Sequence, residues 1–176
     1  MNEDFAGSQA VPSVALCPAT TADEALLLEI YASTRVEELA LVPWSDEQKQ
    51  AFVMMQFTAQ QQHYRKEHPD ARHDIIMRND RPVGRLYVAR RDGAIEILDI
   101  TLLPQERNAG IGSHLIRELI SEAEQSRRAL RIYVESFNPS LRLFERLGFS
   151  RIGDEGIHFL MEWSPAQKNT SKSVST

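Results

Sequence analysis

The sequence predicts an α+β fold with a mixed sheet. Two observations lead to this expectation: apolar patterns with helical spacing interleave with short runs typical of strands, and several of those runs are joined by tight turns, as in hairpins. With 176 residues, 42% of them hydrophobic, the chain can fill one hydrophobic core. We therefore expect one domain over residues 13–163, between disordered tails at residues 1–12 and 164–176, whose composition is small and polar.

The first part of the chain is expected to form one strand and two helices. Residues 14–17 are a short apolar run typical of a strand. The capping box Thr21-x-x-Glu24 predicts the start of the first helix, and Ser45 is expected to cap the second, which ends near His68-Pro69. The stripes expected to face the core are Leu27, Ile30, Tyr31 and Thr34 in the first helix and Phe52, Met55, Ala59 and His63 in the second.

The rest of the chain is expected to alternate strands with helices. Turn residues at 79–82, 91–94 and 154–156 separate neighbouring strands. Helical spacing predicts two further helices, at 111–126 and 139–147. The expected strands are residues 74–77, 83–89, 95–103 and 129–134, followed by a closing pair that ends with 157–163.

The most informative segment joins the strand at 95–103 to the helix at 111–126. It contains Arg107-x-x-Gly110-x-Gly112. The first amides of a helix have no partner inside the helix, and they lie at the positive end of its dipole. Glycine lacks a Cβ atom, so a phosphate can approach the backbone closely at such positions. The pattern predicts a site for a phosphate-bearing ligand, and the alternative is a turn with packing chemistry alone.

Two common phosphate sites are excluded by the residues that follow the glycines. A nucleoside-triphosphate loop requires Lys-Ser or Lys-Thr after its last glycine, whereas Ser113-His114 stands here. A dinucleotide-binding turn requires a third glycine at position 115, which is Leu115. The site is therefore expected to take a different phosphate-bearing molecule.

A second motif, residues 138–149, follows the strand at 129–134. Together with Arg107-x-x-Gly110-x-Gly112 it resembles the paired signature of the GNAT N-acetyltransferase superfamily, in which V-x-P-x-x-R-G-x-G-x-G precedes N-x-x-A-x-x-L-Y-x-x-x-G-F. The matching positions are Leu102, Pro104, Arg107, Gly110, Gly112, Asn138, Leu143, Gly148 and Phe149. Residues 31–35 and 41–45 are also similar to an uncharacterised bacterial subgroup of that superfamily.

The resemblance implies a fold and a reaction. The fold is a mixed, mostly antiparallel sheet of about seven strands, splayed between the fourth and fifth, with about four flanking helices. The activity is direct transfer of an acetyl group from acetyl-CoA to a primary amine of a small molecule or peptide. The alternative is a catalytically silent module that has the same fold and binds acyl-CoA or a partner.

The resemblance also assigns residues to the coenzyme. The pyrophosphate is expected on backbone amides around residues 107–113, and the pantetheine is expected to pair with residues 100–102 like an added strand. The candidate cofactor-binding residues are Ile100, Thr101, Leu102, Arg107, Asn108, Ala109, Gly110, Ile111, Gly112, Ser113, Asn138 and Phe144.

Two carboxylates are candidates for the catalytic base. A lysine-like amine has a pKa of about 10.4, so a nearby base helps to make it neutral before attack. Glu96 lies six residues before Leu102, where histone-acetylating members of the superfamily carry a catalytic glutamate, and its apolar neighbours predict partial desolvation. Asp99 would lie on the opposite face by strict alternation, unless a bulge redirects it. Both also fit ordinary solvent-facing strand positions.

The chain departs from the family pattern at two positions. Asn108 stands where a glycine is common, and Phe144 stands where the family usually has tyrosine. A tyrosine there is thought to protonate the departing thiolate, which phenylalanine cannot do. We expect Phe144 to serve packing, with Tyr133 or solvent as the proton source. Asn138-Pro139 also has a structural interpretation, since asparagine and proline open helices efficiently.

Composition excludes several classes of protein. A net charge of −5 and a pI near 5.6 argue against a nucleic-acid-binding surface. No apolar run approaches the ~20 residues of a membrane span, and the first residues lack the basic and apolar regions of a secretory signal, so none is expected. Cys17, the only cysteine, is expected to be buried and reduced, which favours a cytoplasmic location. The histidine spacing predicts no metal site, and monomer and homodimer both remain open.

Overall fold

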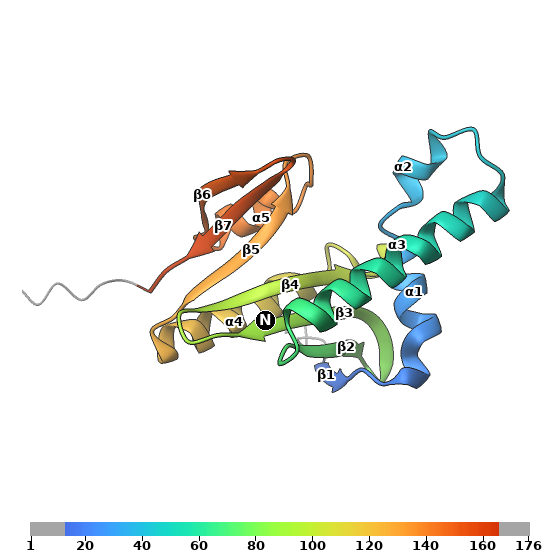
Figure 1. The fold of residues 1–176 in the computed structure, drawn as a ribbon. Helices are drawn as coiled ribbons and strands as arrows, with labels where there is room; N and C mark the ends of the chain where they lie inside the picture. The colour runs from blue at the N-terminus through green and yellow to red at the C-terminus, as the bar shows by residue number, and fades with distance from the viewer. Residues whose placement is uncertain (1–12, 166–176) are drawn as a thin grey trace, which may run out of the picture.

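A seven-stranded sheet in the order β1-β2-β3-β4-β5-β7-β6 forms the centre of the molecule (Figure 1). The computed structural model describes residues 13–165, so most of the two expected tails lies outside the described residues. The strands are β1 (Val14–Pro18), β2 (Arg72–Arg78), β3 (Arg81–Arg90), β4 (Ala94–Leu102), β5 (Ala129–Glu135), β6 (Ser150–Glu155) and β7 (His158–Trp163).

Helices cover both faces of the sheet. In Figure 1, α3 crosses in front of β3 and β4, whereas α4 lies behind these strands. The α-helices of the described chain are α1 (Glu24–Ala32), α2 (Val36–Ala40), α3 (Asp46–Glu67), α4 (Ile111–Ser126) and α5 (Leu141–Arg146), and short 3₁₀ turns span Thr21–Asp23 and Pro104–Glu106. No helix among the described residues is both long and apolar enough to cross a membrane.

Two clusters of buried side chains correspond to these two layers. The larger cluster packs α4, through residues such as Leu115 and Leu119, against the sheet. The smaller cluster joins Leu27 of α1 and Phe57 of α3 to Ile75 of β2. Apolar burial on both faces of the sheet therefore holds α1, α3 and α4 in place.

The sheet is antiparallel except between β4 and β5. Those two strands run parallel because α4 forms the crossover between them. Their pairing covers only Ala94–Ile97 against Ala129–Ile132, after which the strands diverge (Figure 1). The mixed sheet and the separation between the fourth and fifth strands are thus confirmed.

A bulge interrupts β4 just where it separates from β5. Tyr87 of β3 pairs with Asp99, but Val88 pairs with Ile97, so Leu98 is an extra residue on β4. A one-residue bulge reverses the alternation of faces beyond it. This reversal places Asp99 on the same side of the sheet as Glu96. The sequence allowed for this arrangement only if β4 contained a bulge.

Several local predictions are confirmed. The structure has α4 at the predicted residues 111–126, and Ser45 caps α3 through a hydrogen bond from the amide of Gln48. Gly148 follows α5 with φ at +91°, as expected for a glycine at a helix end. These features depend on a few consecutive residues, so their sequence signals are strong.

Other local predictions are wrong. The first capping box belongs to Thr20 with Asp23 and opens a 3₁₀ turn before α1, not a helix capped by Thr21. The sequence did not predict α2. The motif helix α5 begins at Leu141, two residues after Pro139, because the Asn138 side chain accepts a hydrogen bond from the Ser140 amide and stabilises a turn instead.

Burial is also wrong at several places, and the predicted stripe residues Thr34, Ala59 and His63 are exposed. Cys17 is exposed, because β1 is an edge strand and its side chain points away from the core that Val14 and Leu16 contact. On α3 the buried face contains Val53, Phe57 and Gln61, whereas the expected Met55 is 57% exposed. Apolar residues occur on several sides of α3, so the sheet rather than the helical pattern selects the buried face.

Candidate active site

The candidate site begins at the turn that joins β4 to α4. The 3₁₀ turn Pro104–Glu106 carries the chain out of the sheet, and Arg107 then donates a hydrogen bond from Nε to the carbonyl of Leu102 at 3.1 Å. This contact closes the turn over the end of β4. Arg107, a candidate cofactor-binding residue, therefore also stabilises the conformation of the turn.

Two residues of this turn adopt left-handed backbone conformations. Gly110, with φ at +82°, is the N-cap of α4, and Asn108 has φ at +61°. Asparagine tolerates this region better than other residues that carry a side chain, because its short polar group can bond locally. The departure of Asn108 from the usual glycine therefore preserves the conformation of the turn.

The turn leaves a row of unpaired amides at the start of α4. Among the described residues, the N–H groups of residues 108–113 donate to no carbonyl and no side chain, and Gly110 provides no side-chain cap. The row lies at the positive end of a sixteen-residue helix. Consecutive free amides at such a position form an anion-binding site.

The adjoining part of β4 has an open edge. On the β5 side, Ile100, Thr101 and Leu102 have no strand partner within the described chain, although β3 pairs with all three on the other side. An extended ligand can form hydrogen bonds to such an edge. Gly84 allows the close approach of β3, because a Cβ there would lie 2.3 Å from the Thr101 carbonyl oxygen.

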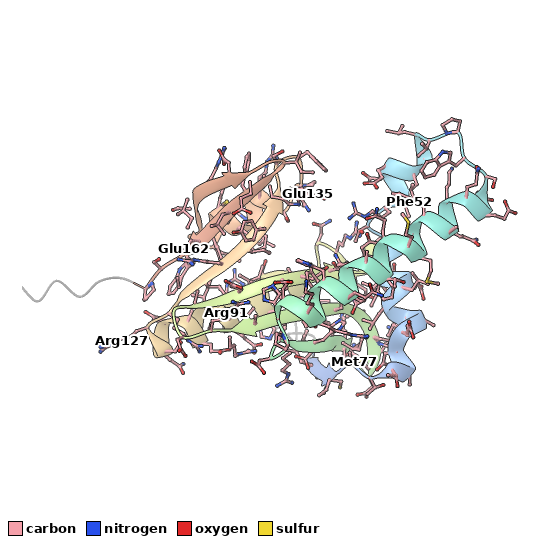
Figure 2. All side chains as sticks on the ribbon, viewed as in Figure 1. Phe52, Met77, Arg91, Arg127, Glu135 and Glu162 are labelled. Carbon is pink, nitrogen blue, oxygen red and sulfur yellow. The ribbon has the colours of Figure 1, made fainter. Side chains whose placement is uncertain are left out.

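Glu96 lies at the base of the β4–β5 separation. Its carboxylate is 3.6 Å from Arg91 Nε and 3.9 Å from His68 Nδ1, and its side chain is 29% exposed. Figure 2 shows Arg91 at the turn between β3 and β4. Glu96 is partly buried as expected, but not by its sequence neighbours, because Ile95 and Ile97 face the opposite layer of the sheet. Glu96 instead lies in a polar group with an accessible oxygen.

Asp99 has much closer partners than Glu96. Arg85 Nη2 donates to one of its oxygens at 2.7 Å, and the Thr101 hydroxyl donates to the other at 2.7 Å. The Arg85 side chain is only 1% exposed and also donates to Gln60 of α3. Because both oxygens of Asp99 are already engaged, Asp99 is better suited to hold the bulge than to contact a substrate.

Tyr64 fixes the bulge from the α3 side. Its hydroxyl donates to the carbonyl of Leu98 at 2.9 Å. Burial, and next the negative charge of Asp99, raise the pKa of Tyr64 far above its usual range. The phenol therefore remains protonated and keeps donating to the bulge at all physiological pH values.

Alternate residues of β5 lie on the same side of the sheet as Glu96 and complete the candidate site. Tyr133 is half exposed, and its hydroxyl donates to Glu155 of β6 at 3.2 Å. Partial burial and this hydrogen bond raise the pKa of Tyr133. Beyond it, Glu135 lies at the end of β5 (Figure 2), 3.9 Å from Nη1 of Arg35 beside α2. Glu135 of β5 and Glu155 of β6 thus place two carboxylates on the side of the candidate base.

The two residues predicted from the second motif already have partners within the described chain. Phe144 is 2% exposed and packs edge-on against Phe149, with ring centroids 5.3 Å apart. Its ring belongs to the core. Asn138 forms the turn before α5, so its side-chain carbonyl is already occupied.

Sequence reasoning missed Tyr64, Arg85 and His68. These side chains reach β4 from α3 and β3, and nothing in their local sequence separates them from other polar residues. The available signal was weak: Arg85 interrupts an otherwise apolar strand, residues 83–89, and a charged residue in a buried strand requires a partner. Among the described residues no group of three metal-ligating side chains converges.

Comparison with known families agrees with this geometry. The profile of the acetyltransferase (GNAT) family matches residues 30–149, which include β4, the amide-lined turn and α4. The match covers more than half of the chain, and the protein belongs to the GNAT acetyltransferase family. No curated protein matches the sequence.

Solved structures share the fold at low sequence identity. The PaiA N-acetyltransferase from Thermoplasma acidophilum, in complex with coenzyme A, is 17% identical with a TM-score of 0.66; the similarity covers 86% of this chain and 99% of that one. An acetyltransferase from Thermus thermophilus is 18% identical, with a TM-score of 0.63 and coverage of 88% and 98%. A GNAT family acetyltransferase from Elizabethkingia anophelis with acetyl-CoA bound is 17% identical, with a TM-score of 0.53 and coverage of 86% and 97%.

Proposed function

We propose that the protein transfers an acetyl group directly from acetyl-CoA to a primary amine of a small molecule or peptide. The row of unpaired amides at residues 108–113, next to the open edge of β4, carries this proposal. An anion site beside an extended edge suits a ligand with a pyrophosphate and a long amide-bearing arm. Coenzyme A has both parts, and two of the structural neighbours contain coenzyme A or acetyl-CoA.

The coenzyme would lie along elements that are already formed. Its pyrophosphate would accept hydrogen bonds from the amides around Gly110 and Gly112, and its pantetheine amides would pair with residues 100–102. Binding would then need few specific side chains, because backbone groups supply the hydrogen bonds. The thioester would lie near the bulge at Leu98, where Tyr64 holds the backbone.

Glu96 is the proposed base. The amine nitrogen attacks the thioester carbonyl, the C–N bond forms, the C–S bond breaks, and the amine proton passes to the Glu96 carboxylate, directly or through a water. The coenzyme departs as a thiolate with a pKa near 8.5, a tolerable leaving group that Tyr133 or solvent can protonate. Glu96 is accessible and less engaged than Asp99, which supports this division of roles.

The test is an acetyl-transfer assay with the full chain. The protein is incubated with acetyl-CoA and a panel of small amines, amino acids and peptides with free N-termini, and free thiol is measured over time. Thiol release that requires both protein and amine, with an acetylated product found by mass spectrometry, is expected. Release that requires no amine would indicate hydrolysis and would contradict the proposal.

A second candidate function is a silent module that binds acyl-CoA without turnover. Phe144, which replaces the usual tyrosine and is buried in the core, favours it. Both candidates predict acetyl-CoA binding, so only turnover distinguishes them. If acetyl-CoA binds but no amine of a broad panel is acetylated, the silent module becomes the better description.

A further inference from the structure

A second hollow lies on the α1–α3 side of the sheet, away from the β4–α4 turn. It has a volume of about 470 Å³, and none of its lining residues comes from β4, α4 or β5. The 3₁₀ turn, the start of α1, the C-terminal half of α3, and strands β2 and β3 form its walls. Polar lining residues include Thr20, Glu24, Thr58, Gln61, Arg65 and His73.

Two polar groups in these walls have no protein partner. Gln61 is only 8% exposed, and its amide nitrogen is buried without a hydrogen-bond acceptor among the described residues. The Nε2 atom of His73 is likewise buried and unpartnered within that part of the chain. A buried donor without an acceptor costs about 1–3 kcal/mol. Two such groups around one hollow indicate that a bound molecule supplies the missing acceptors.

The charges around the hollow favour an anionic acceptor. Burial, and next the positive charge of Arg85, lower the pKa of His73 to about 4, so its ring is neutral near pH 7 and can carry a hydrogen on Nε2. The Gln61 amide nitrogen is a donor in every state. Arg65 lines the same hollow, and its positive charge adds to the lowering of the His73 pKa and partly offsets the rise that burial gives the Tyr87 pKa. Two donors and a guanidinium match a carboxylate.

We propose that this hollow binds a small carboxylate-bearing molecule, with the carboxylate held by Gln61, His73 and Arg65. Glu24 on the opposite wall would accept an ammonium group if the ligand carries one. The site is separate from the acetyl-transfer site and does not depend on the proposed function. Three neighbouring aromatic rings connect the two sites. The ring centroids of His73 and Tyr87 are 4.4 Å apart, and those of Tyr87 and Tyr64 are 5.1 Å apart.

The experiment uses nuclear magnetic resonance on the isotopically labelled full chain. Acetate, succinate and 4-aminobutyrate are each titrated to millimolar concentration at constant pH and ionic strength. We expect at least one to shift the side-chain amide signals of Gln61 and the ring signals of His73 in a saturable way. The Gln61 signals are assigned by their loss in Gln61→Leu, a change that removes a buried unpaired amide and should preserve the fold.

Two variants and a matched control decide the outcome. Gln61→Leu and Arg65→Gln should each raise the dissociation constant by about tenfold, the expected effect of losing one charge-assisted hydrogen bond, with the His73 ring as reporter. Gln56→Leu makes the same change on an exposed position of α3 outside the hollow and should leave binding unchanged. Absence of saturable shifts with all three carboxylates, or equal affinity in Gln61→Leu and wild type, would overturn the proposal.

Discussion

Glu96 and Asp99 are both acidic residues of β4 on the same side of the sheet, yet their surroundings give them different roles. Asp99 is 12% exposed and bonded at 2.7 Å to a buried arginine, whereas the nearest cation to Glu96 is 3.6 Å away. A carboxylate that must accept a proton needs a free oxygen near the substrate. At the scale of single residues, hydrogen-bond occupancy therefore separates the proposed base from the structural carboxylate.

The first prediction concerns the base. Glu96→Gln should lower kcat for acetyl transfer by about 10²–10⁴-fold, because the amide cannot accept the amine proton. The dissociation constant for acetyl-CoA should barely change, since Glu96 lies on the acceptor side. The measurement is the pH–rate profile of wild type and variant with the best amine of the panel.

An amine of lower pKa serves as the control for this variant. An α-amine, with a pKa of about 8, is already partly neutral and should lose less rate than a lysine-type amine. If the pH–rate profile of Glu96→Gln matches that of wild type, the proton passes instead to Asp99 or to water.

The second prediction concerns the buried ion pair. Asp99→Asn should lower the free energy of unfolding by about 3 kcal/mol, because it leaves the Arg85 charge buried without its partner. The double variant Arg85→Met with Asp99→Leu should recover much of this loss, since both charges are removed together. Urea denaturation of wild type and the two variants gives the values, and a double variant no more stable than Asp99→Asn would contradict the explanation.

The matched control for this pair is an exposed one. Asp154 of β6 forms an ion pair with Arg151 in which both side chains are at least half exposed. Asp154→Asn should leave the urea midpoint unchanged, because exposed pairs are screened by solvent.

At the scale of elements, the start of α4 would supply the proposed anion site through backbone groups alone. Gly110 and Gly156 both have positive φ, and an added Cβ would contact nothing within 4 Å at either position. Alanine at either site therefore costs about 1–2 kcal/mol of backbone strain without a steric clash. Comparing Gly110→Ala with Gly156→Ala therefore distinguishes the effect of backbone strain alone from the effect of disturbing the amides at the start of α4.

The third prediction uses this pair. Acetyl-CoA should raise the melting temperature of wild type and of Gly156→Ala, since a ligand selective for the folded state stabilises it by mass action. In Gly110→Ala the rise should shrink strongly, because the left-handed conformation that exposes the amides is disfavoured. Thermal unfolding with and without acetyl-CoA measures both effects. A full rise in Gly110→Ala, or none in wild type, would contradict the placement of the coenzyme.

The fourth prediction concerns α5, which buries Phe144. Phe144→Tyr should bind acetyl-CoA as tightly as wild type and turn over at least as fast, at a cost of about 1–3 kcal/mol in unfolding free energy for a buried hydroxyl. Steady-state kinetics and urea denaturation measure the two effects. If wild type binds acetyl-CoA without turnover and Phe144→Tyr acetylates the same amines, wild type is the silent module.

At the scale of the whole molecule, the two layers on the sheet contribute different kinds of burial. The α1–α3 layer includes the buried or half-buried polar residues Arg85, Gln61 and His73, whereas the α4 layer contains the buried Asp74, which pairs with Arg72. Buried polar groups make stability depend on pH when they titrate. His73, in the α1–α3 layer, should therefore contribute to how the fold responds to acid.

The fifth prediction gives the direction of that response. The pKa of His73 falls from 6.5 to about 4 on folding, so the unfolded chain takes up its proton first as the pH falls. The contribution of His73 to stability is present above about pH 6.5 and is lost between there and about pH 4. Urea midpoints at intervals across this window should fall less steeply in His73→Phe, which keeps the stack on Tyr87. Equal slopes in both proteins would assign the acid response to other groups, among them His68, whose pKa burial also lowers.

The sequence by itself determined the features that consecutive residues encode. The turn from β4 into α4, with its glycines at positions 110 and 112, could be placed because backbone conformation and helix start are local properties. The order of strands and helices, and the family to which the chain belongs, followed from the same local signals and the paired motifs.

Only the tertiary structure decided which side chains meet. A single extra residue, Leu98, moved Asp99 to the face of Glu96, and pairing with β3 creates that bulge. The buried face of α3, with Tyr64 on the bulge and Gln61 in the second hollow, was likewise selected by the sheet beneath it. Strand register and burial depend on contacts between segments far apart in the chain, and those contacts leave little trace in any short stretch of residues.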